Sequence, residues 1–439
     1  MENFDQKCVP PDNEGALKAF LQSAVYTEAL WKNDYNCDEE KVRSYTLPEI
    51  SSQTVAEWET SERPRLMQQF KDILYGEMPP APDRLELELL AEKENALDGL
   101  ALRKEIRIHC AMDNGKKFDF DMLLYVPKNV PEPPVFLGLN FSGNQANTPE
   151  EDVLQTRALD YKYTEPFIVP CTLRSTRLDS WNYVEAVKRG YAVATACYCD
   201  ICPDHLNGLK KSVFTLFYDD KDLRSEYEVP FEEQRGGAWR RKVTQIGAWA
   251  WGLSRMLDAL EKEPLVNAQK AAVLGHSRNG KAALWAGVCD ERFKLVISNN
   301  SGCCGASLSR RNFGETLRIL FWEKRSWVAG NLVDYIDDPC KLPFDQHQVL
   351  AAVAPRHLYV ASSSADNVAD PKGEFLSALA ASKVWELYGK KGLGTSERPP
   401  LDTPVGEEIG YHCKNGKHSI CAYDWEQYYN FADKIFRKR

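Results

Sequence analysis

Residues 271–281 read Ala-Ala-Val-Leu-Gly-His-Ser-Arg-Asn-Gly-Lys, and this stretch decides the fold of the 439-residue chain. An apolar run typical of a buried strand leads into a tight turn at Gly275-His276-Ser277, and a helical pattern follows from Gly280. A serine on such a strand-to-helix turn is exposed at the top of its sheet, where the helix N-terminus directs amide groups at an oxyanion. The stretch therefore predicts an α/β enzyme with Ser277 as its nucleophile.

The turn departs from the usual Gly-x-Ser-x-Gly pattern at one position. Asn279 lies two residues after Ser277, and Gly280 comes one residue later than the pattern requires. Asparagine tolerates unusual backbone angles better than most residues, so a tight turn is still expected. The alternative is that Ser277 only caps a helix. The turn pattern alone leaves both interpretations open.

Short apolar runs alternate with helical stretches over most of the chain. Such alternation predicts buried parallel strands joined by right-handed helical crossovers. The runs cover residues 135–140, 191–196, 271–275, 295–298 and 358–362, and the helical stretches cover about 64–75, 182–189, 243–263, 279–289, 374–389 and 423–437. Residues 102–127 alternate as antiparallel strands do. We expect an α/β-hydrolase fold, a three-layer αβα sandwich with a mostly parallel central sheet. Residues 1–14 are expected to form a flexible arm and residues 15–439 a single catalytic domain.

Composition excludes several classes of function. The net charge of −9, from 64 acidic and 55 basic residues, argues against nucleic-acid binding, which needs a basic surface. No run of about 18 apolar residues predicts a transmembrane helix. The first residues lack the pattern of a signal peptide, so we expect either a cytoplasmic protein or a chain from which a signal was removed. Cys197, Cys199 and Cys202 lack the second half of a metal motif and are interpreted as buried thiols, with no metal expected.

A serine nucleophile needs a base and an acid that orients the base. In α/β-hydrolases both follow the serine in the chain, the acid first. His418 lies in a loop between the last predicted strand and the last helix, whereas His412, the alternative base, lies inside that strand. Asp366 and Asp370 follow the strand at 358–362, and Asp370, which precedes a proline, is the better candidate for a structural role.

The sequence around the serine resembles the glucuronoyl esterases, carbohydrate esterase family 15, and most closely their bacterial branch. The resemblance covers roughly residues 60–437. Its motifs are Gly275-x-Ser-Arg-x-Gly-Lys, Asn299-Asn-Ser-Gly-Cys, Leu308-Ser-Arg-Arg-Asn-Phe-Gly-Glu, Leu342-Pro-Phe-Asp-Gln-His, Ala369-Asp-Pro-Lys-Gly-Glu-Phe and Asp424-Trp-Glu. It implies hydrolysis of the ester between 4-O-methyl-glucuronic acid on glucuronoxylan and lignin alcohols. No metal or organic cofactor is implied. We expect a monomer that acts on glucuronoxylan or uronate-ester fragments, in the periplasm or outside the cell.

The resemblance also assigns the base and its acid. His418 occupies the position of the family's catalytic histidine. The family's acid occupies either of two loops, and at the earlier one this chain has Asn300, whose amide cannot stabilise an imidazolium as a carboxylate does. The resemblance therefore implies that Asp366, in the later loop, is the acid.

Substrate contacts are implied by the same resemblance. Arg278 is expected to stabilise the oxyanion with its backbone amide and its side chain. Lys281 and Glu315 are expected to bind sugar hydroxyls, with Arg310 and Arg311 lining the site or bracing Glu315. Val368 replaces a tryptophan that stacks on the sugar in many relatives, so Trp327 or Trp322 is expected to compensate.

Two alternative functions remain at this point. One keeps the fold and changes the substrate, giving an acetyl-xylan or feruloyl-type carbohydrate esterase or a peptidase. The other is an inactive hydrolase homologue that only binds carbohydrate. The complete set Ser277, His418 and Asp366 argues against the second alternative.

Overall fold

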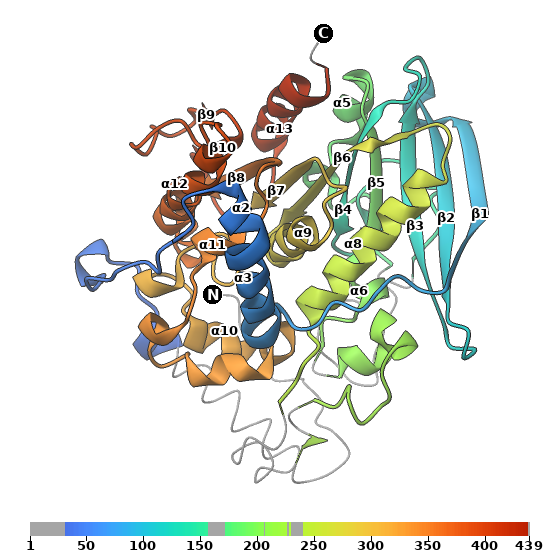
Figure 1. Cartoon of the computed structure of the whole chain (residues 1–439). Helices are drawn as coiled ribbons and strands as arrows, with labels where there is room; N and C mark the ends of the chain where they lie inside the picture. Colours follow the sequence, from blue (N-terminus) through green and yellow to red (C-terminus); the bar gives the residue numbers. More distant parts are fainter. Residues whose placement is uncertain (1–30, 157–171, 206, 226–227, 230–239, 438–439) are drawn as a thin grey trace.

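The computed structural model describes residues 31–156, 172–205, 207–225, 228–229 and 240–437. The predicted arm at residues 1–14 lies outside these ranges. Within them, a ten-stranded sheet forms the centre of the protein (Figure 1), in the order β1-β2-β3-β5-β4-β6-β7-β8-β10-β9. The strands are β1 (Arg84–Asn95), β2 (Ala101–Ala111), β3 (Lys117–Pro127), β4 (Pro134–Asn140), β5 (Ala192–Cys197), β6 (Asn267–His276), β7 (Leu295–Asn299), β8 (His357–Ser363), β9 (Val405–Gly406) and β10 (Ile409–Lys414).

The central strands are parallel and the outer ones antiparallel. Strands β5, β4, β6, β7, β8 and β10 pair in parallel, so their carboxyl ends meet at one edge of the sheet. Strands β1, β2 and β3 form an antiparallel extension on one side, and β9 is antiparallel to β10 on the other. This arrangement confirms the predicted α/β-hydrolase fold.

Helices cover both faces of the sheet (Figure 1). They are α2 (Val55–Glu57), α3 (Arg63–Phe70), α4 (Ala96–Gly99), α5 (Tyr183–Lys188), α6 (Tyr198–Ile201), α8 (Gln245–Glu261), α9 (Arg278–Cys289), α10 (Leu317–Glu323), α11 (Gln346–Ala351), α12 (Pro371–Leu387) and α13 (Ala422–Phe436). None of the helices in the described part of the chain is long and apolar enough to cross a membrane.

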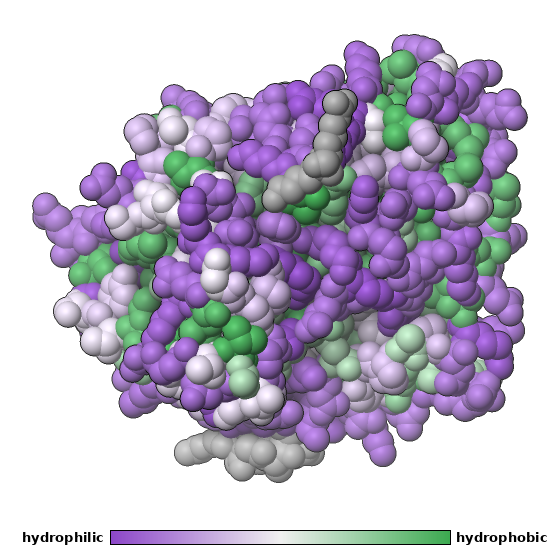
Figure 2. All heavy atoms as spheres, turned by 45° about the horizontal axis from the view of Figure 1, so that its top comes forward, coloured by the Kyte–Doolittle hydropathy of each residue, from purple (hydrophilic) through white to green (hydrophobic). Residues whose placement is uncertain are grey.

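Alternating side chains of the strands build two hydrophobic cores. In β4, Val135 and Leu137 pack on the face covered by α8, α9 and α12, whereas Phe136 packs on the face covered by α5 and α13. Side chains of a strand point alternately to the two faces, so a strand buried on both must be apolar at nearly every position. This explains why the buried strands appear in the sequence as continuous apolar runs. Figure 2 shows hydrophilic side chains over most of the face that it presents, with hydrophobic residues in small separate groups.

Two elements differ from the expectation. The helical stretch predicted over 64–75 ends at Gly76, where φ is 76°, but it already begins at Val55. A capping box between Thr54 and Glu57 starts it there. The antiparallel region also begins earlier than residue 102, because the alternating Leu and Glu residues of β1 form an additional edge strand.

The turn between β6 and α9 depends on two glycines. A Cβ atom at Gly275 would lie 1.9 Å from the carbonyl oxygen of Asn279, and one at Gly280 would lie 3.0 Å from the carbonyl oxygen of Gly275. The second glycine that allows this close packing therefore lies three residues after Ser277 rather than two. Asn279 has another role, since its side-chain amide donates to the carbonyl oxygen of Leu139 at 3.1 Å and ties α9 to β4.

We predict that Gly275→Ala lowers the free energy of unfolding by about 2 to 3 kcal/mol, because the added methyl group overlaps the first turn of α9. Urea unfolding of the purified protein measures this loss. Gly416→Ala is the matched control, because the atoms nearest to its Cβ are at ordinary contact distance, 3.6 Å or more. A Gly275→Ala protein as stable as the control variant would contradict the tight packing of the turn.

Candidate active site

Ser277 stands alone between the last residue of β6 and the first of α9. Its backbone angles, φ 58° and ψ −128°, are strained for a residue with a side chain. Its amide donates to the carbonyl oxygen of Asn299 at 2.9 Å, and its own carbonyl oxygen accepts from the amides of Gly280 and Lys281. Neighbours on both sides thus hold the strained residue, as expected of a nucleophile elbow.

His418 and Asp366 meet at the same edge of the sheet. His418 lies in the loop after β10, and its Nδ1 is 2.5 Å from Oδ2 of Asp366, which follows β8. Burial opposes ionisation of Asp366, but the hydrogen bond and charge of His418 hold its pKa below its usual value. An ionised carboxylate at Nδ1 leaves Nε2 of His418 free to accept a proton.

Asn300 lies beside this pair. Its side-chain amide donates to Oδ2 of Asp366 and to Oγ of Ser363, each at 2.8 Å. The residue in the position of the family's alternative acid therefore supports the carboxylate in the later loop. The sequence interpretation of Asn300 and Asp366 is consistent with this geometry.

No hydrogen bond joins Ser277 Oγ to His418 among the residues that the structure describes. His418 instead lies beside the residue that precedes the serine, since the ring centroid of His276 is 4.6 Å from that of His418. Catalytic hydrogen bonds are commonly long without substrate and tighten when it binds. The side chain of His418 is 44% exposed, so a bound substrate can reach it.

Arg278 begins α9 directly after the serine. Its guanidinium pairs with Asp204 and lies over the ring of Trp327, 4.7 Å from the centroid. Trp327 in turn donates from its indole nitrogen to Asp204 at 2.8 Å. Arg278 is thus fixed at a helix N-terminus, where an isolated cation is disfavoured, by a carboxylate and an aromatic face.

Lys281 and Glu315 lie on the same side of the site. The ammonium group of Lys281 donates to the carbonyl oxygen of Ser301 at 2.5 Å, and is 3.9 Å from Glu315 and 5.9 Å from the ring centroid of Trp327. Burial raises the pKa of Glu315, and the charge of Lys281 offsets this only in part. The structure therefore groups four of the residues expected from the sequence: Arg278, Lys281, Glu315 and Trp327.

Arg310 is not part of this group, and the expectation that it lines the substrate site is corrected. Its guanidinium donates to the carbonyl oxygens of Cys340, Leu342 and Phe344 and to Asp345. These acceptors surround a side chain that is only 6% exposed. Arg310 therefore braces the segment before α11. Arg311 likewise bonds to Asp370 and Glu39 rather than to Glu315.

Aromatic cover at the site is limited. Val368 is 42% exposed and the carbonyl oxygen of that residue accepts from the amide of Glu315 at 3.0 Å, so it lies at the rim where a stacking ring was expected. Trp327 is only 5% exposed, and Trp322 is covered by the guanidinium of Arg325, 4.0 Å from its ring centroid. Trp327 therefore offers little area for stacking on a sugar, and Trp322, which is partly exposed, already has a guanidinium over its ring.

The first described segment of the chain runs along this rim. The amide of Gly314 donates to the carbonyl oxygen of Asn36 at 2.6 Å, directly beside Glu315. Trp31 donates to Glu323 at 2.6 Å, and Glu39 pairs with Arg311. Residues 31–41 therefore form one wall beside the group of Arg278, Lys281, Glu315 and Trp327.

A buried polar network lies beneath His418. Asp424, which is fully buried, accepts from His412 at 2.9 Å, from Asn299 at 3.1 Å and from Lys414 at 2.7 Å. Burial alone would raise the pKa of Asp424, but the hydrogen bond of His412 and the charge of Lys414 lower it to about 2. His412, the alternative base, is fully buried and bonded at both nitrogens, to Asp424 and to Tyr359. This placement suits a structural role.

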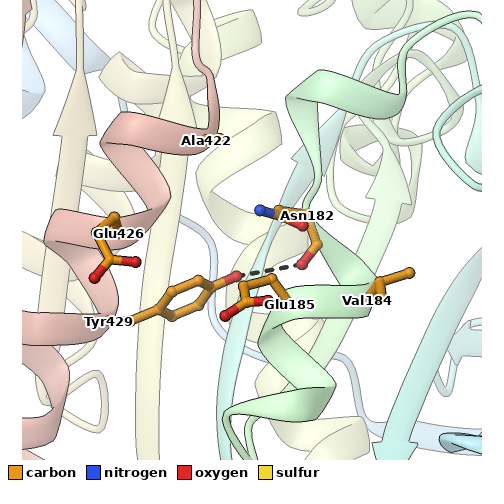
Figure 3. A pocket seen from close by; sticks show the side chains of 6 residues that line it. All are labelled: Asn182, Val184, Glu185, Ala422, Glu426 and Tyr429. Carbon is orange, nitrogen blue, oxygen red and sulfur yellow. Dashed lines mark hydrogen bonds between the residues drawn. The ribbon is translucent and has the colours of Figure 1, made fainter.

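The described residues contain no group of three or more His, Cys, Asp or Glu side chains that could hold a metal ion, and Cys197, Cys199 and Cys202 are buried free thiols. A separate pocket lies between α5 and α13 (Figure 3). Its lining consists of Asn182, Val184, Glu185, Ala422, Glu426 and Tyr429. It includes none of the residues grouped around Ser277.

Three contributors were missed by sequence reasoning. Asp204 lies in an irregular segment far from Arg278 in the chain, so no local pattern links them. His276 and Asn299 are partners because β6 and β7 pair in register at those residues. Only the position of His276 beside the nucleophile could have drawn attention to it.

Comparisons with known proteins show which proteins this chain is similar to. A family model described as "Glucuronyl esterase, fungi" matches residues 238–389. The carbohydrate esterase MZ0003 of an unknown prokaryotic organism is 35% identical, covering 93% of this chain and 96% of that protein. A solved CE15 esterase from a marine bacterial metagenome, described as promiscuous, is 35% identical with a TM-score of 0.78, covering 91% of this chain and 99% of its own. The glucuronoyl esterase from Solibacter usitatus is 36% identical with a TM-score of 0.79, covering 91% of this chain and 100% of its own.

We predict that Asp204→Asn lowers kcat about 10-fold with a smaller change in KM. The reason is that Arg278 loses the carboxylate that holds its guanidinium in place to stabilise the oxyanion of the transition state. Initial rates with a chromogenic ester measure this effect. Asp113→Asn, which breaks the exposed pair with Arg84, is the matched control and should leave kcat unchanged. An equal kcat for the two variants would contradict the role of Asp204.

Asp424 should make stability depend on pH. Its folded pKa lies below the value of about 3.9 for an unfolded chain, so its contribution is complete above pH 4 and is lost as the pH falls towards 2. The shift corresponds to about 2 kcal/mol. Urea unfolding should therefore show Asp424→Asn to be less stable than wild type by about that amount at pH 7. This difference should shrink below pH 4, and a difference independent of pH would contradict the prediction.

Proposed function

Because the chain belongs to carbohydrate esterase family 15, the family of the glucuronoyl esterases, we propose that it hydrolyses the ester between 4-O-methyl-glucuronic acid on glucuronoxylan and lignin alcohols. It is a carboxylic ester hydrolase. The observation that carries the substrate proposal is the grouping of Ser277 with two cations, Arg278 and Lys281, and the buried Glu315. This grouping offers an oxyanion partner together with donors and acceptors for sugar hydroxyls.

The first step is acyl transfer to the serine. His418 accepts the proton of Ser277 at Nε2 while Oγ attacks the carbonyl carbon of the ester. The oxyanion that forms is stabilised by the guanidinium of Arg278 and by backbone amides at the start of α9. The tetrahedral intermediate then collapses, and the alcohol leaves with the proton from His418. Asp366, held ionised by its hydrogen bonds, stabilises the transient imidazolium.

The second step returns the enzyme to its starting state. A water molecule gives a proton to His418 and attacks the acyl carbon. The second tetrahedral intermediate passes through the same oxyanion position. Its collapse releases the glucuronic acid group, and His418 returns the proton to Ser277.

Recognition of the sugar is assigned to groups beside the nucleophile. Lys281 lies one helical turn after Ser277, so its ammonium group reaches the same side of α9. Glu315, whose carboxylate lies 3.9 Å from the ammonium group of Lys281, offers its oxygens as acceptors to sugar hydroxyls.

One observation favours a wider range of esters. Val368 supplies an aliphatic side chain at the rim, Trp327 is buried, and the ring of Trp322 is occupied by the guanidinium of Arg325. Weak stacking reduces discrimination between a sugar ring and other acyl groups. Acetyl-xylan or feruloyl-type esters are therefore the second candidate substrates.

We further propose that the protein acts as a monomer, in the periplasm or outside the cell, where plant polymers are encountered.

The decisive experiment is hydrolysis of benzyl glucuronate. We predict that wild type releases benzyl alcohol and that Ser277→Ala is slower by at least about 1,000-fold, because the nucleophile is lost. Ser377→Ala, which changes a buried serine in α12, is the matched control and should keep the wild-type rate. Equal rates for wild type and Ser277→Ala would refute the mechanism. Cleavage of acetyl or feruloyl esters without cleavage of benzyl glucuronate would instead favour the second candidate.

A further inference from the structure

We propose that His276, the residue before the nucleophile, is a positioning residue for His418: a neutral imidazole of fixed tautomer against which the ring of the base rests. The inference rests on the proposed role of His418 as general base. It concerns a side chain that neither the acyl-transfer steps nor the sugar contacts use. Its basis is a contact between two imidazole rings and the hydrogen bonds behind it.

His418 has one firm polar anchor, the bond from Nδ1 to Asp366 at 2.5 Å. The covalent link through Cβ and this one hydrogen bond still leave the ring free to tilt, and Ser277 supplies no second hydrogen bond among the described residues. The ring of His276 lies 4.6 Å away at an interplanar angle of 41°. This second contact restricts the tilt of the ring, and with it the direction in which Nε2 points.

The tautomer of His276 follows from its neighbours. Nδ1 lies 2.6 Å from the side-chain oxygen of Asn299. The amide nitrogen of Asn299 faces the carboxylate of Asp424 at 3.1 Å and the hydroxyl of Tyr428 at 2.7 Å. An ionised carboxylate only accepts hydrogen bonds, so the amide group must present its nitrogen to Asp424 and its oxygen to His276. The proton of neutral His276 therefore resides on Nδ1.

The charge of His276 is fixed as well. Burial, His418 and Lys414 lower its pKa to about 3, although Asn299 and Asp424 act in the opposite direction. The ring facing His418 is therefore neutral at physiological pH. This matters when His418 takes the serine proton, because a cationic neighbour would oppose the imidazolium, whereas a neutral ring face does not.

Asp424 links this ring to the loop that carries the base. One oxygen holds Asn299, and the other accepts from Lys414 at 2.7 Å and from the amide of Cys421 at 2.8 Å. Lys414 also donates to the carbonyl oxygen of Ser419, the residue after His418, at 2.5 Å. One buried carboxylate thus positions both His418, through its loop, and the ring against which it rests.

The test compares His276→Ala with His276→Phe. Loss of the ring should lower kcat for benzyl glucuronate about 10- to 100-fold with KM within about 2-fold, because the base is misplaced while the sugar contacts persist. Phe restores a neutral ring, so His276→Phe should recover most of the lost rate.

Labelling by a fluorophosphonate separates this inference from the proposed substrate. The reagent needs an activated serine but no glucuronate, so His276→Ala should label about 10- to 100-fold more slowly than wild type even if benzyl glucuronate is not a substrate. His347→Ala, which removes a buried histidine bonded to the carbonyl oxygen of Pro48, is the matched control and should label at the wild-type rate. Wild-type labelling and kcat in His276→Ala, or no recovery in a folded His276→Phe, would overturn the proposal.

Discussion

The close approach of α9 to the end of β6 is the constraint on which the site depends. The first turn of the helix passes so near the strand that position 275 has no space for a Cβ atom. Ser277 must then adopt positive φ, and its neighbours must point to opposite sides of the sheet edge. His276 bonds to Asn299 in the buried network of Asp424, and Arg278 contacts Asp204 and Trp327. One tight turn therefore places the proposed nucleophile Ser277 between His276, which contacts His418, and Arg278, the proposed oxyanion partner.

The strain in this turn is balanced by contacts that are themselves functional. The amide of Ser277 bonds to Asn299, whose side chain fixes His276. The loop after Asn299 continues to Asn300, which supports Asp366, and to Ser301, whose carbonyl oxygen holds Lys281. A strained residue persists only where the surrounding structure determines it strongly. Here the same bonds that hold the serine also orient the residues proposed to act with it.

Much of the fold and part of the site could be predicted from the sequence. Buried parallel strands leave continuous apolar runs, and α/β topology brings their carboxyl ends together, so Ser277, Asp366 and His418 could be expected to converge. Arg310 could not be placed in this way, because its nearness to Glu315 in the sequence does not fix the direction of its side chain. The turn at Ser309–Arg311 directs it towards the carbonyl oxygens before α11. Asp204 and Asn299 contribute through partners set by irregular segments and strand register, for which the sequence carries no local signal.

The wall formed by residues 31–41 can vary in shape while the sheet and the turn at Ser277 stay fixed. The sheet and its turn admit little change, since each residue there contacts several others. Among the described residues, the wall instead joins the rest through the backbone bridge at Gly314, the hydrogen bond from Trp31 to Glu323 and ion pairs of Asp34 and Glu39. Substitutions or insertions within residues 31–41 can therefore change the shape of the entrance while the reacting groups stay in place.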